Sequence, residues 1–214
     1  MKMQLIEHYL SIQGEGLHPG KLTYFVRFAR CNLSCSWCDS TYTFGKGDEV
    51  SFAVVANAIL GSKARFVCLT GGEPLLHTED CLRLIKHFPE LRFDIETGGA
   101  LDIAPVQLAN ASVVMDWKLK HSGMNHKMKE AHLTLLRPDQ DLLKFVTDGS
   151  DEEKAEMLAL ITRTETLNFP ISIQPVWGTD SQKLTEWVLS LKNPRLQVNL
   201  QIHKLIWGPV KTGV

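Results

Sequence analysis

Short apolar runs alternate with amphipathic segments along almost the whole chain, and this alternation constrains the fold most. Continuous apolar strands are typical of a parallel sheet that is buried on both faces. Repeated strand–helix units with right-handed crossovers predict an α/β fold, either doubly wound or an incomplete parallel (β/α) barrel of six or so strand–helix units. The predicted strands are Thr23–Phe28, Arg65–Leu69, Arg92–Glu96, Ser112–Trp117, Asp141–Val146, Pro170–Gln174 and Leu196–Ile202.

Helices are expected between these strands, with ends set by capping residues and by glycine or proline. The first two expected helices run from the cap Ser51 to Gly61 and from the cap Thr78 to just before Pro89. A third begins at Ser150 or Asp151, and a fourth runs from Thr179 or Asp180 to Leu191. The segment Met124–Leu136 has weaker helical character. We expect residues 1–214 to form a single domain, because the length suits one core and no linker or repeat is visible.

Composition excludes several classes of protein. Hydrophobic residues make up 44% and charged residues 22%, which is typical of globular proteins rather than disordered, collagen-like or coiled-coil chains. The formal charge of −1 argues against a dedicated nucleic-acid binder, which normally carries a basic excess. No apolar run has the length of a membrane helix, and the first residues lack the apolar stretch of a signal peptide. We therefore expect a soluble cytoplasmic protein without a nucleic-acid or membrane partner.

The cysteines carry the strongest chemical signal. Cys31, Cys35 and Cys38 fall within eight residues, whereas Cys68 and Cys81 stand alone in a predicted strand and helix. Thiolates at this spacing can converge on one object, and soft sulfur ligands select zinc, copper(I) or an iron–sulfur cluster. A structural zinc site would need a fourth ligand such as Asp39 or a histidine. A four-iron cluster normally takes four thiolates, so three would leave one iron open for a substrate or cofactor.

Functional residue types follow the predicted strands at their carboxyl ends. Ligands bind at this edge in both doubly wound sheets and barrels. The segments concerned are Ala29-Arg30 with the cysteines, Thr70–Pro74, Thr97–Gly99, Lys118–Lys120 and Pro175–Gly178. We expect the active site there.

Two motifs resemble those of the radical S-adenosylmethionine (SAM) superfamily. They are C-x3-C-x2-C with Trp37 before the last cysteine, and the glycine-rich turn Thr70–Pro74 (TGGEP). Within that superfamily, most of the chain resembles the 7-carboxy-7-deazaguanine synthases. The matching segments are Ile12–Gly16 (IQGEG), Phe25–Arg27, Cys31–Ser40 (CNLSCSWCDS), Glu96–Gly98 and His203–Gly208 (HKLIWG). The resemblance favours the incomplete barrel, opened by a substrate motif and closed by a carboxy-terminal tail.

This resemblance implies a reaction and its cofactors. The family converts 6-carboxy-5,6,7,8-tetrahydropterin into 7-carboxy-7-deazaguanine with loss of ammonia, for queuosine and other 7-deazapurines. It uses a [4Fe-4S] cluster whose open iron chelates SAM, an adenosyl radical formed from that SAM, and Mg²⁺. It also implies an external electron donor such as a flavodoxin, and a homodimer.

The resemblance further implies a role for individual residues. Cys31, Cys35 and Cys38 would bind the cluster and Ser40 the Mg²⁺. Arg27 would pair with the substrate carboxylate, and an unpaired arginine in an apolar strand would indeed be costly. Catalytic roles are expected for Glu15, Arg27 and Glu96. Further substrate contacts are expected from Ile12, Gln13, Gly14, Thr70 and Val214. SAM contacts are expected from Gly72, Glu73, Glu96, Thr97, Asp116, Trp117, Lys118, Gln174, Pro175, Val176 and Trp177.

Two other readings fit the cysteine motif. A glycyl-radical-enzyme activase has the same three-cysteine loop, but the Gln13–Gly16 segment and the tail favour the synthase. A zinc-stabilised binding module is the alternative outside enzymes. Metal content separates either enzyme from the module, because a cluster contains iron and sulfide and the module would contain zinc.

Overall fold

A computed structural model, which describes residues 2–209 and 212–213, contains one sheet of nine strands in the order β3-β1-β2-β4-β5-β6-β7-β8-β9. The strands are β1 (Lys2–Ile12), β2 (Leu22–Phe28), β3 (Asp48–Ser51), β4 (Phe66–Gly71), β5 (Arg92–Thr97), β6 (Ala111–Trp117), β7 (Leu142–Thr147), β8 (Ile171–Pro175) and β9 (Leu196–Val198). The helices are α1 (Phe52–Ser62), α2 (Thr78–His87), α3 (Glu130–Leu133), α4 (Asp151–Arg163), α5 (Ser181–Ser190) and α6 (Ile202–Trp207).

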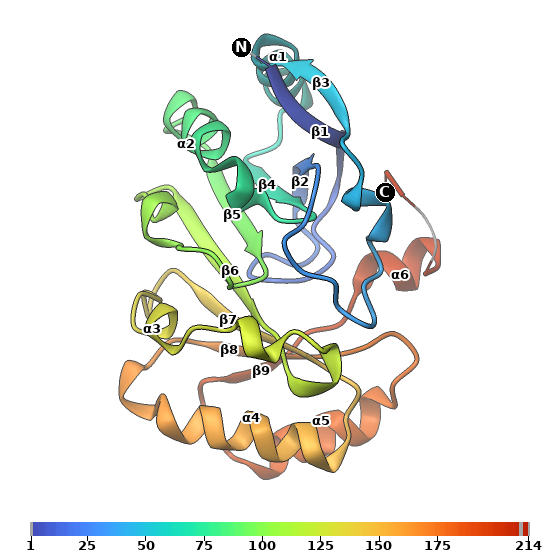
Figure 1. Ribbon diagram of the computed structural model, residues 1–214, viewed down its shortest axis with the longest axis vertical. Helices are drawn as coiled ribbons and strands as arrows, with labels where there is room; N and C mark the ends of the chain where they lie inside the picture. Colours follow the sequence, from blue (N-terminus) through green and yellow to red (C-terminus); the bar gives the residue numbers. More distant parts are fainter. Residues whose placement is uncertain (1, 210–211, 214) are drawn as a thin grey trace.

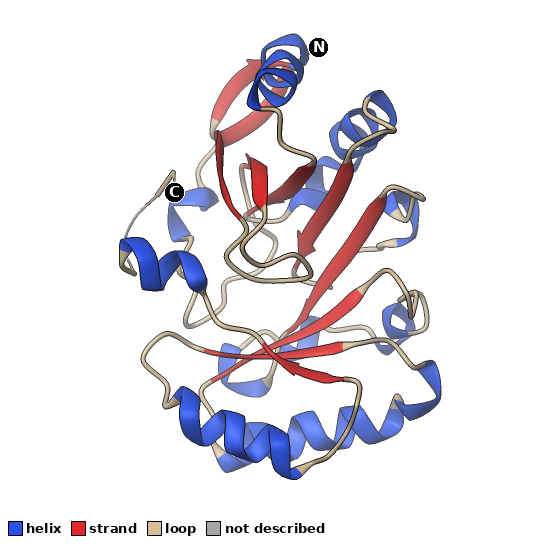
Figure 2. Cartoon of the chain, turned by 180° about the vertical axis from the view of Figure 1, so that it is seen from behind, coloured by secondary structure: helices blue, strands red, loops and turns tan. Residues whose placement is uncertain are grey.

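Neighbouring strands pair in parallel through the run β2-β4-β5-β6-β7-β8-β9 of the sheet. These strands fan out in a curved sheet (Figure 1). Strands β3 and β9 form its two edges, so the sheet does not close. Helices α4 and α5 cover the β7–β9 end in both views (Figure 2). The expected α/β fold, an incomplete parallel barrel of strand–helix units, is confirmed. No helix in the described ranges is long and apolar enough to cross a membrane.

Alternating residues along the central strands face two different environments. Apolar residues such as Phe93, Ile95 and Phe145 belong to the core that packs against the helices. The residues between them are polar and face the inside of the curve, because side chains alternate along a strand. Examples are Asp94 and Lys144, both buried. The strands therefore carry an apolar outer face and a polar inner face, which the apolar runs in the sequence did not indicate.

Several expected boundaries were wrong. Strands β1 and β3 were not predicted, because they pair antiparallel at the edge and keep many side chains half-exposed. The run Leu196–Ile202 stays in the sheet only to Val198, and Ile202 begins α6. The chain leaves the sheet there because Asn199 Nδ2 and the Ile202 amide donate hydrogen bonds to the loop after β1, at 2.8 and 2.9 Å.

The expected helix ends were correct at some capping residues and wrong at others. Ser150 and Asp180 cap α4 and α5 through their side chains, as expected. Helix α1 continues through Gly61 and ends at Lys63, which is in the left-handed region with φ 57°. The cap position of α2 is His77 rather than the expected Thr78, which is the first residue of the helix. The shift arises because a 3₁₀ turn over Pro74–His77 runs directly into α2. Between Met124 and Leu136 the only α-helix is the single turn α3.

Candidate active site

A cavity of about 420 Å³ lies at the carboxyl ends of the parallel strands. It is lined by most of the residues singled out above: Ile12, Gln13, Gly14, Glu15, Arg27, Cys31, Cys35, Cys38, Ser40, Thr70, Gly72, Glu96, Thr97, Asp116, Lys118, Gln174, Val176 and Trp177. Glu73, Trp117 and Pro175 are buried but do not line it. Val214 lies outside the described residues.

Close backbone packing holds the cysteine loop against the end of β4. The amides of Gly72 and Glu73 donate to the carbonyls of Phe28 and Arg30, at 3.2 and 2.8 Å. A Cβ atom at Gly72 would lie 2.1 Å from the Arg30 carbonyl oxygen. Glycine is needed here because no side chain fits between the two segments.

The Glu73 carboxylate makes hydrogen bonds within the protein interior. Its side chain is fully buried and accepts hydrogen bonds from the Leu75 amide, the Gly98 amide and the Thr97 hydroxyl, at 2.8 to 3.0 Å. Burial raises the pKa of its carboxyl in spite of these donors. Glu73 therefore joins the turns after β4 and β5, and its side chain does not line the cavity.

The three cysteines of the loop are free, half-buried and open to one cavity. Burial raises the pKa of the Cys31 and Cys35 thiols. Within the described ranges, only His121, Asp148 and Glu153 bring three ligand atoms within 4.8 Å of one another. The cysteine sulfurs are therefore not gathered as they would be around a single zinc ion, where each lies about 2.3 Å from the metal. Three thiol ligands around a wider space suit an iron–sulfur cluster.

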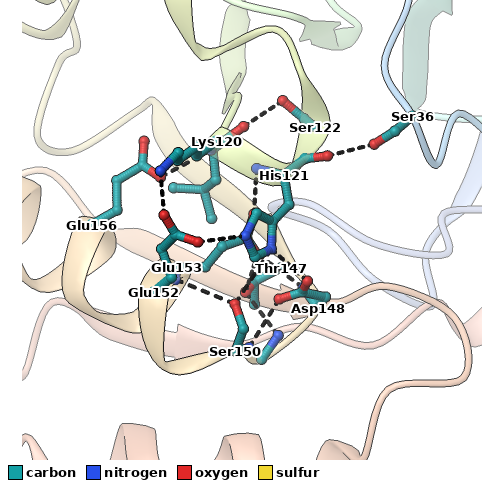
Figure 3. Close-up of polar contacts among 12 residues, drawn as sticks. Ser36, Lys120, His121, Ser122, Thr147, Asp148, Ser150, Glu152, Glu153 and Glu156 are labelled. Carbon is teal, nitrogen blue, oxygen red and sulfur yellow. Dashed lines mark hydrogen bonds and ion pairs between the residues drawn. The ribbon is translucent and has the colours of Figure 1, made fainter.

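The far side of the cysteine loop rests on the 3₁₀ turn Lys120–Ser122. Ser36 donates through its hydroxyl to the His121 carbonyl at 2.6 Å and through its amide to the Ser122 carbonyl at 3.0 Å (Figure 3). The His121 ring lies between Asp148 and Glu152, at 2.7 and 2.9 Å. Hydrogen bonds to these two carboxylates raise the pKa of His121 to about 9. The protonated ring donates from both nitrogens and has no lone pair left for a metal.

Arg27 has partners within the protein, although it faces the cavity. Its Nε donates to Glu7 Oε1 at 2.7 Å and its Nη2 to the Tyr9 hydroxyl at 3.2 Å. The Tyr42 ring lies 5.9 Å from its Cζ. A guanidinium has five N–H donors, so Arg27 can bind a further carboxylate while Glu7 holds its orientation.

Lys144 on β7 is the main residue that the sequence reading missed. Its Nζ lies 3.2 Å from Glu15 and 3.1 Å from Glu96, and 4.0 Å from Asp116. Lys118 also pairs with Asp116, at 2.9 Å. A lysine in the middle of the apolar run DLLKFV was the available signal, because a buried ammonium needs a carboxylate partner.

The two glutamates that share Lys144 have different proton affinities. Burial raises the pKa of Glu96 to about 7, and the Glu15 charge adds to this effect while Lys144 opposes it. Burial acts in the same direction on Glu15, but Lys144 and His203 prevail and lower its pKa. Carboxyl groups whose pKa values are pushed apart in this way are suited to separate acid and base roles.

Four polar atoms around the cavity are buried and have no hydrogen-bond partner among the described residues. They are Gln13 Nε2, Glu96 Oε1, Asp116 Oδ1 and Gln174 Oε1. Buried polar groups in proteins are normally paired, so these atoms indicate a polar ligand or ordered water. One donor and three acceptors on different walls fit a heterocycle with both kinds of group on its edge.

The carboxy-terminal tail closes one side of the cavity. Lys204 on α6 pairs with Asp39 of the cysteine loop at 2.5 Å. The His203 ring packs against Gly14, where a Cβ atom would lie 2.0 Å from His203 Nδ1. Gln201 also lines the cavity, and all three were missed as site residues. The distinctive HKLIWG tail was the signal that could have identified His203 and Lys204, whereas Gln201 lies just before it.

The sequence is similar to proteins of known family. Residues 25–114 match a family model described as the radical SAM superfamily. The chain is 33% identical to the 7-carboxy-7-deazaguanine synthase of Clostridium acetobutylicum over 100% of both chains. It is also 33% identical to the 7-carboxy-7-deazaguanine synthase of Methanospirillum hungatei, over 97% of this chain and 86% of that protein.

The fold also resembles a solved structure. The crystal structure of QueE from Escherichia coli aligns with a TM-score of 0.74 over 94% of both chains. The identity in this alignment is 20%, so it supports the architecture alone.

Proposed function

The chain belongs to the 7-carboxy-7-deazaguanine synthases of the radical SAM superfamily, and from this premise we propose how its cavity carries out their reaction. That reaction converts 6-carboxy-5,6,7,8-tetrahydropterin into 7-carboxy-7-deazaguanine with loss of ammonia. One observation supports the assignment of roles best. The same cavity is lined by three free cysteines, an oriented arginine and four buried polar atoms without a hydrogen-bond partner in the part of the chain that the structure describes.

The cysteine loop would hold the cluster. Cys31, Cys35 and Cys38 offer three thiol ligands, which leaves the fourth iron of a [4Fe-4S] cluster for SAM. The bound cluster and SAM would supply the radical that removes hydrogen from the substrate. SAM would lie along the strand ends formed by Gly72, Glu96, Thr97, Asp116, Lys118, Gln174, Val176 and Trp177.

Arg27 would bind the substrate carboxylate. A planar guanidinium matches a carboxylate with two parallel hydrogen bonds, and Glu7 keeps Arg27 aimed at the cavity. Gln13 and Glu15 would read the donor and acceptor edge of the pterin. Ile12, Gly14 and Thr70 complete the wall on that side.

Glu96 and Glu15 would divide the proton transfers. With a pKa of about 7, Glu96 is protonated in a large part of the molecules at neutral pH and can donate to the leaving nitrogen. Glu15 has a lowered pKa and stays ionised, so it can accept a proton. Lys144 would keep both side chains in place, because it lies within 3.2 Å of each.

We also propose a Mg²⁺ ligand at Ser40. Its hydroxyl lines the cavity and donates to Asp39 Oδ1 at 3.0 Å, which supplies the oxygen chemistry that magnesium prefers. Lys204 occupies the other Asp39 oxygen, so waters and substrate would provide the remaining ligands.

An external electron donor such as a flavodoxin, and a homodimer, are proposed from the family resemblance alone. A cytoplasmic location is proposed because the cluster needs reduced thiols, which a reducing compartment maintains.

The direct test is turnover by reconstituted protein. With SAM, reductant and Mg²⁺, we expect loss of 6-carboxytetrahydropterin and formation of one ammonia per product. Cys35→Ala should abolish substrate loss and ammonia formation. Cys81 lies in the core and far from the loop in sequence, so Cys81→Ala should retain both activities. Arg27→Gln should weaken substrate binding but allow SAM cleavage, because its proposed role is positioning. A fully loaded cluster without turnover would contradict the proposal.

A further inference from the structure

Asp94 and His18 form a contact beneath the cavity that the proposed chemistry does not use. Asp94 lies on β5 with its side chain 2% exposed, and its Oδ2 lies 2.8 Å from His18 Nδ1. The His18 ring packs on Phe66, the first residue of β4, at 4.6 Å between centroids. The pair is therefore at the amino ends of the strands, opposite the cysteine loop. The His18 side chain is 31% exposed, so it meets solvent there.

Asp94 lies just below the floor of the cavity. Side chains two residues apart on a strand point to the same face, so Asp94 and Glu96 both face the inside of the sheet. Cys68 lines the cavity and is the register partner of Asp94 on the neighbouring strand. Neighbouring strands are about 4.8 Å apart, so Asp94 lies one strand spacing to the side of Cys68, and its Cα lies about 7 Å along β5 from that of Glu96, toward the amino end.

Both carboxylates have one oxygen atom without a partner. Glu96 Oε1 and Asp94 Oδ1 are buried and accept no hydrogen bond from the described residues. Their other oxygens face Lys144 and His18, at 3.1 and 2.8 Å. Internal water is the usual partner of such atoms. A water between these two oxygens would connect Glu96 to Asp94 and, through His18, to solvent.

The reaction needs such a connection if Glu96 is its proton donor, so this inference depends on the proposed function. Loss of NH₃ from the substrate is balanced in atoms, but ammonia becomes ammonium at neutral pH and takes up one proton per turnover. Glu96 must regain a proton before it can act again. Substrate, SAM and the cluster would occupy the rim of the cavity during this time.

We propose that His18 and Asp94 form a proton entry path that reprotonates Glu96 from the amino ends of the strands. His18 Nε2 takes a proton from solvent while Nδ1 gives one to Asp94. Asp94 passes it through water to Glu96. The other ionisable groups that face this path are Glu15, Lys144 and Asp116 around Glu96, and Cys68 between the strands.

The same contact would also serve to anchor the loop between β1 and β2 to the sheet. The two roles make different demands on the side chains. An anchor needs only a hydrogen bond, which asparagine retains at either position. A proton path needs groups that gain and lose protons, which asparagine cannot do.

The experiment compares Asp94→Asn and His18→Asn with the parent, and with His126→Asn as a control at an exposed histidine. Reconstituted proteins with equal iron content are mixed with substrate at pH 6 and quenched during the first turnovers. Glu96 is already protonated at the start, so the first product should form at the parent rate. Later turnovers should be slower, by up to the roughly 10²- to 10⁴-fold that a general acid typically contributes. The expected trace is a burst of one product per active site.

Two further measurements separate a proton path from an anchor. Imidazole should restore the later turnovers of His18→Ala, because it can carry the proton in place of the ring. In the protein without substrate, the infrared carboxyl band assigned by Glu96→Gln should respond more slowly to a pH jump in Asp94→Asn.

Parent-like steady-state rates in both asparagine variants would overturn the proposal. Equal slowing of the first and later turnovers would also overturn it and indicate an anchor only. If Asp94→Asn does not fold, the imidazole experiment on His18→Ala tests the proposal alone. Failure of imidazole to restore the later turnovers would then overturn the proton path. Absence of product from the parent would instead contradict the proposed function.

Discussion

Lys144 sets the charge balance of the whole cavity. It is the one cation between Glu15 and Glu96 among the described residues, and it also lies 4.0 Å from Asp116. Two carboxylates that share one buried lysine cannot both keep ordinary proton affinities. Lys144 lowers the proton affinity of both glutamates about equally, and the deep burial of Glu96 and the extra charge of His203 beside Glu15 then make Glu96 the one that holds a proton at neutral pH.

Lys144→Met should destabilise the protein by about 3 to 5 kcal/mol at pH 8, which is typical when one partner of a buried ion pair is removed. Without Lys144 the pKa of Glu96 would rise further and that of Glu15 would no longer be lowered by this ammonium, so the native state would hold protons that the unfolded chain releases. Stability would then fall as pH rises from 4.5 through the raised values. Urea unfolding at pH 5 and pH 8 measures this difference, with Lys129→Met, at an exposed lysine, as control. An equal loss at both pH values would show that Lys144 has no such role.

At the scale of elements, the turn after β4 decides where the cysteine loop lies. Gly71 has φ 147°, and a Cβ atom there would lie 2.3 Å from the Phe28 carbonyl oxygen. Gly72 meets the Arg30 carbonyl in the same way. The two glycines let the ends of β2 and β4 approach closely enough for the cysteines to face the cavity.

Gly72→Ala should displace the cysteine loop, because the new methyl group would meet backbone that cannot rotate away. We expect a loss of about 1 to 3 kcal/mol in unfolding free energy, typical of overpacking, and less iron bound after reconstitution. The matched control is Gly61→Ala in α1, where nothing lies within 4 Å. That change should raise stability by up to about 1 kcal/mol and leave iron binding unchanged. Full iron content in Gly72→Ala would refute this account of the turn.

For the whole molecule, segments from the beginning and the end of the sequence, residues 14–16 and 199–204, meet at the cavity. The loop after β1 and the segment before α6 are joined by the hydrogen bonds of Asn199 and Ile202. Lys204 then connects α6 to Asp39 beside the last cysteine of the loop. The Lys204 charge lowers the pKa of Asp39 to about 2, although burial acts in the opposite direction. The tail thus joins the loop after β1 to the cysteine loop.

Lys204→Met should loosen this connection without unfolding the protein. The Asp39 side chain is 48% exposed, so we expect a loss of only about 0.5 to 1 kcal/mol, as for exposed ion pairs. Amide hydrogen exchange should become faster in residues 12–16 and 199–207, and KM for the pterin should rise more than kcat falls. Lys204→Arg should restore both. Unchanged exchange in Lys204→Met would mean that the tail is held by other contacts.

Local signals predicted the parallel strands and the residues at their carboxyl ends. The cysteine spacing, the TGGEP turn and the capping residues Ser150 and Asp180 each depend on neighbours in the chain. The edge strands β1 and β3 were missed because half-exposed antiparallel strands lack a continuous apolar run.

The sequence by itself determined the alternation of parallel strands and helices and the close spacing of the three loop cysteines, since periodicity and short spacing are properties of adjacent residues. Only the tertiary structure decided that Lys144 lies between Glu15 and Glu96, that Glu7 holds Arg27, and that Asp94 lies below the cavity floor. These contacts join residues from different strands and loops, often far apart in the chain. Their energies depend on burial and distance, which arise only when the sheet curves and brings its inner face together.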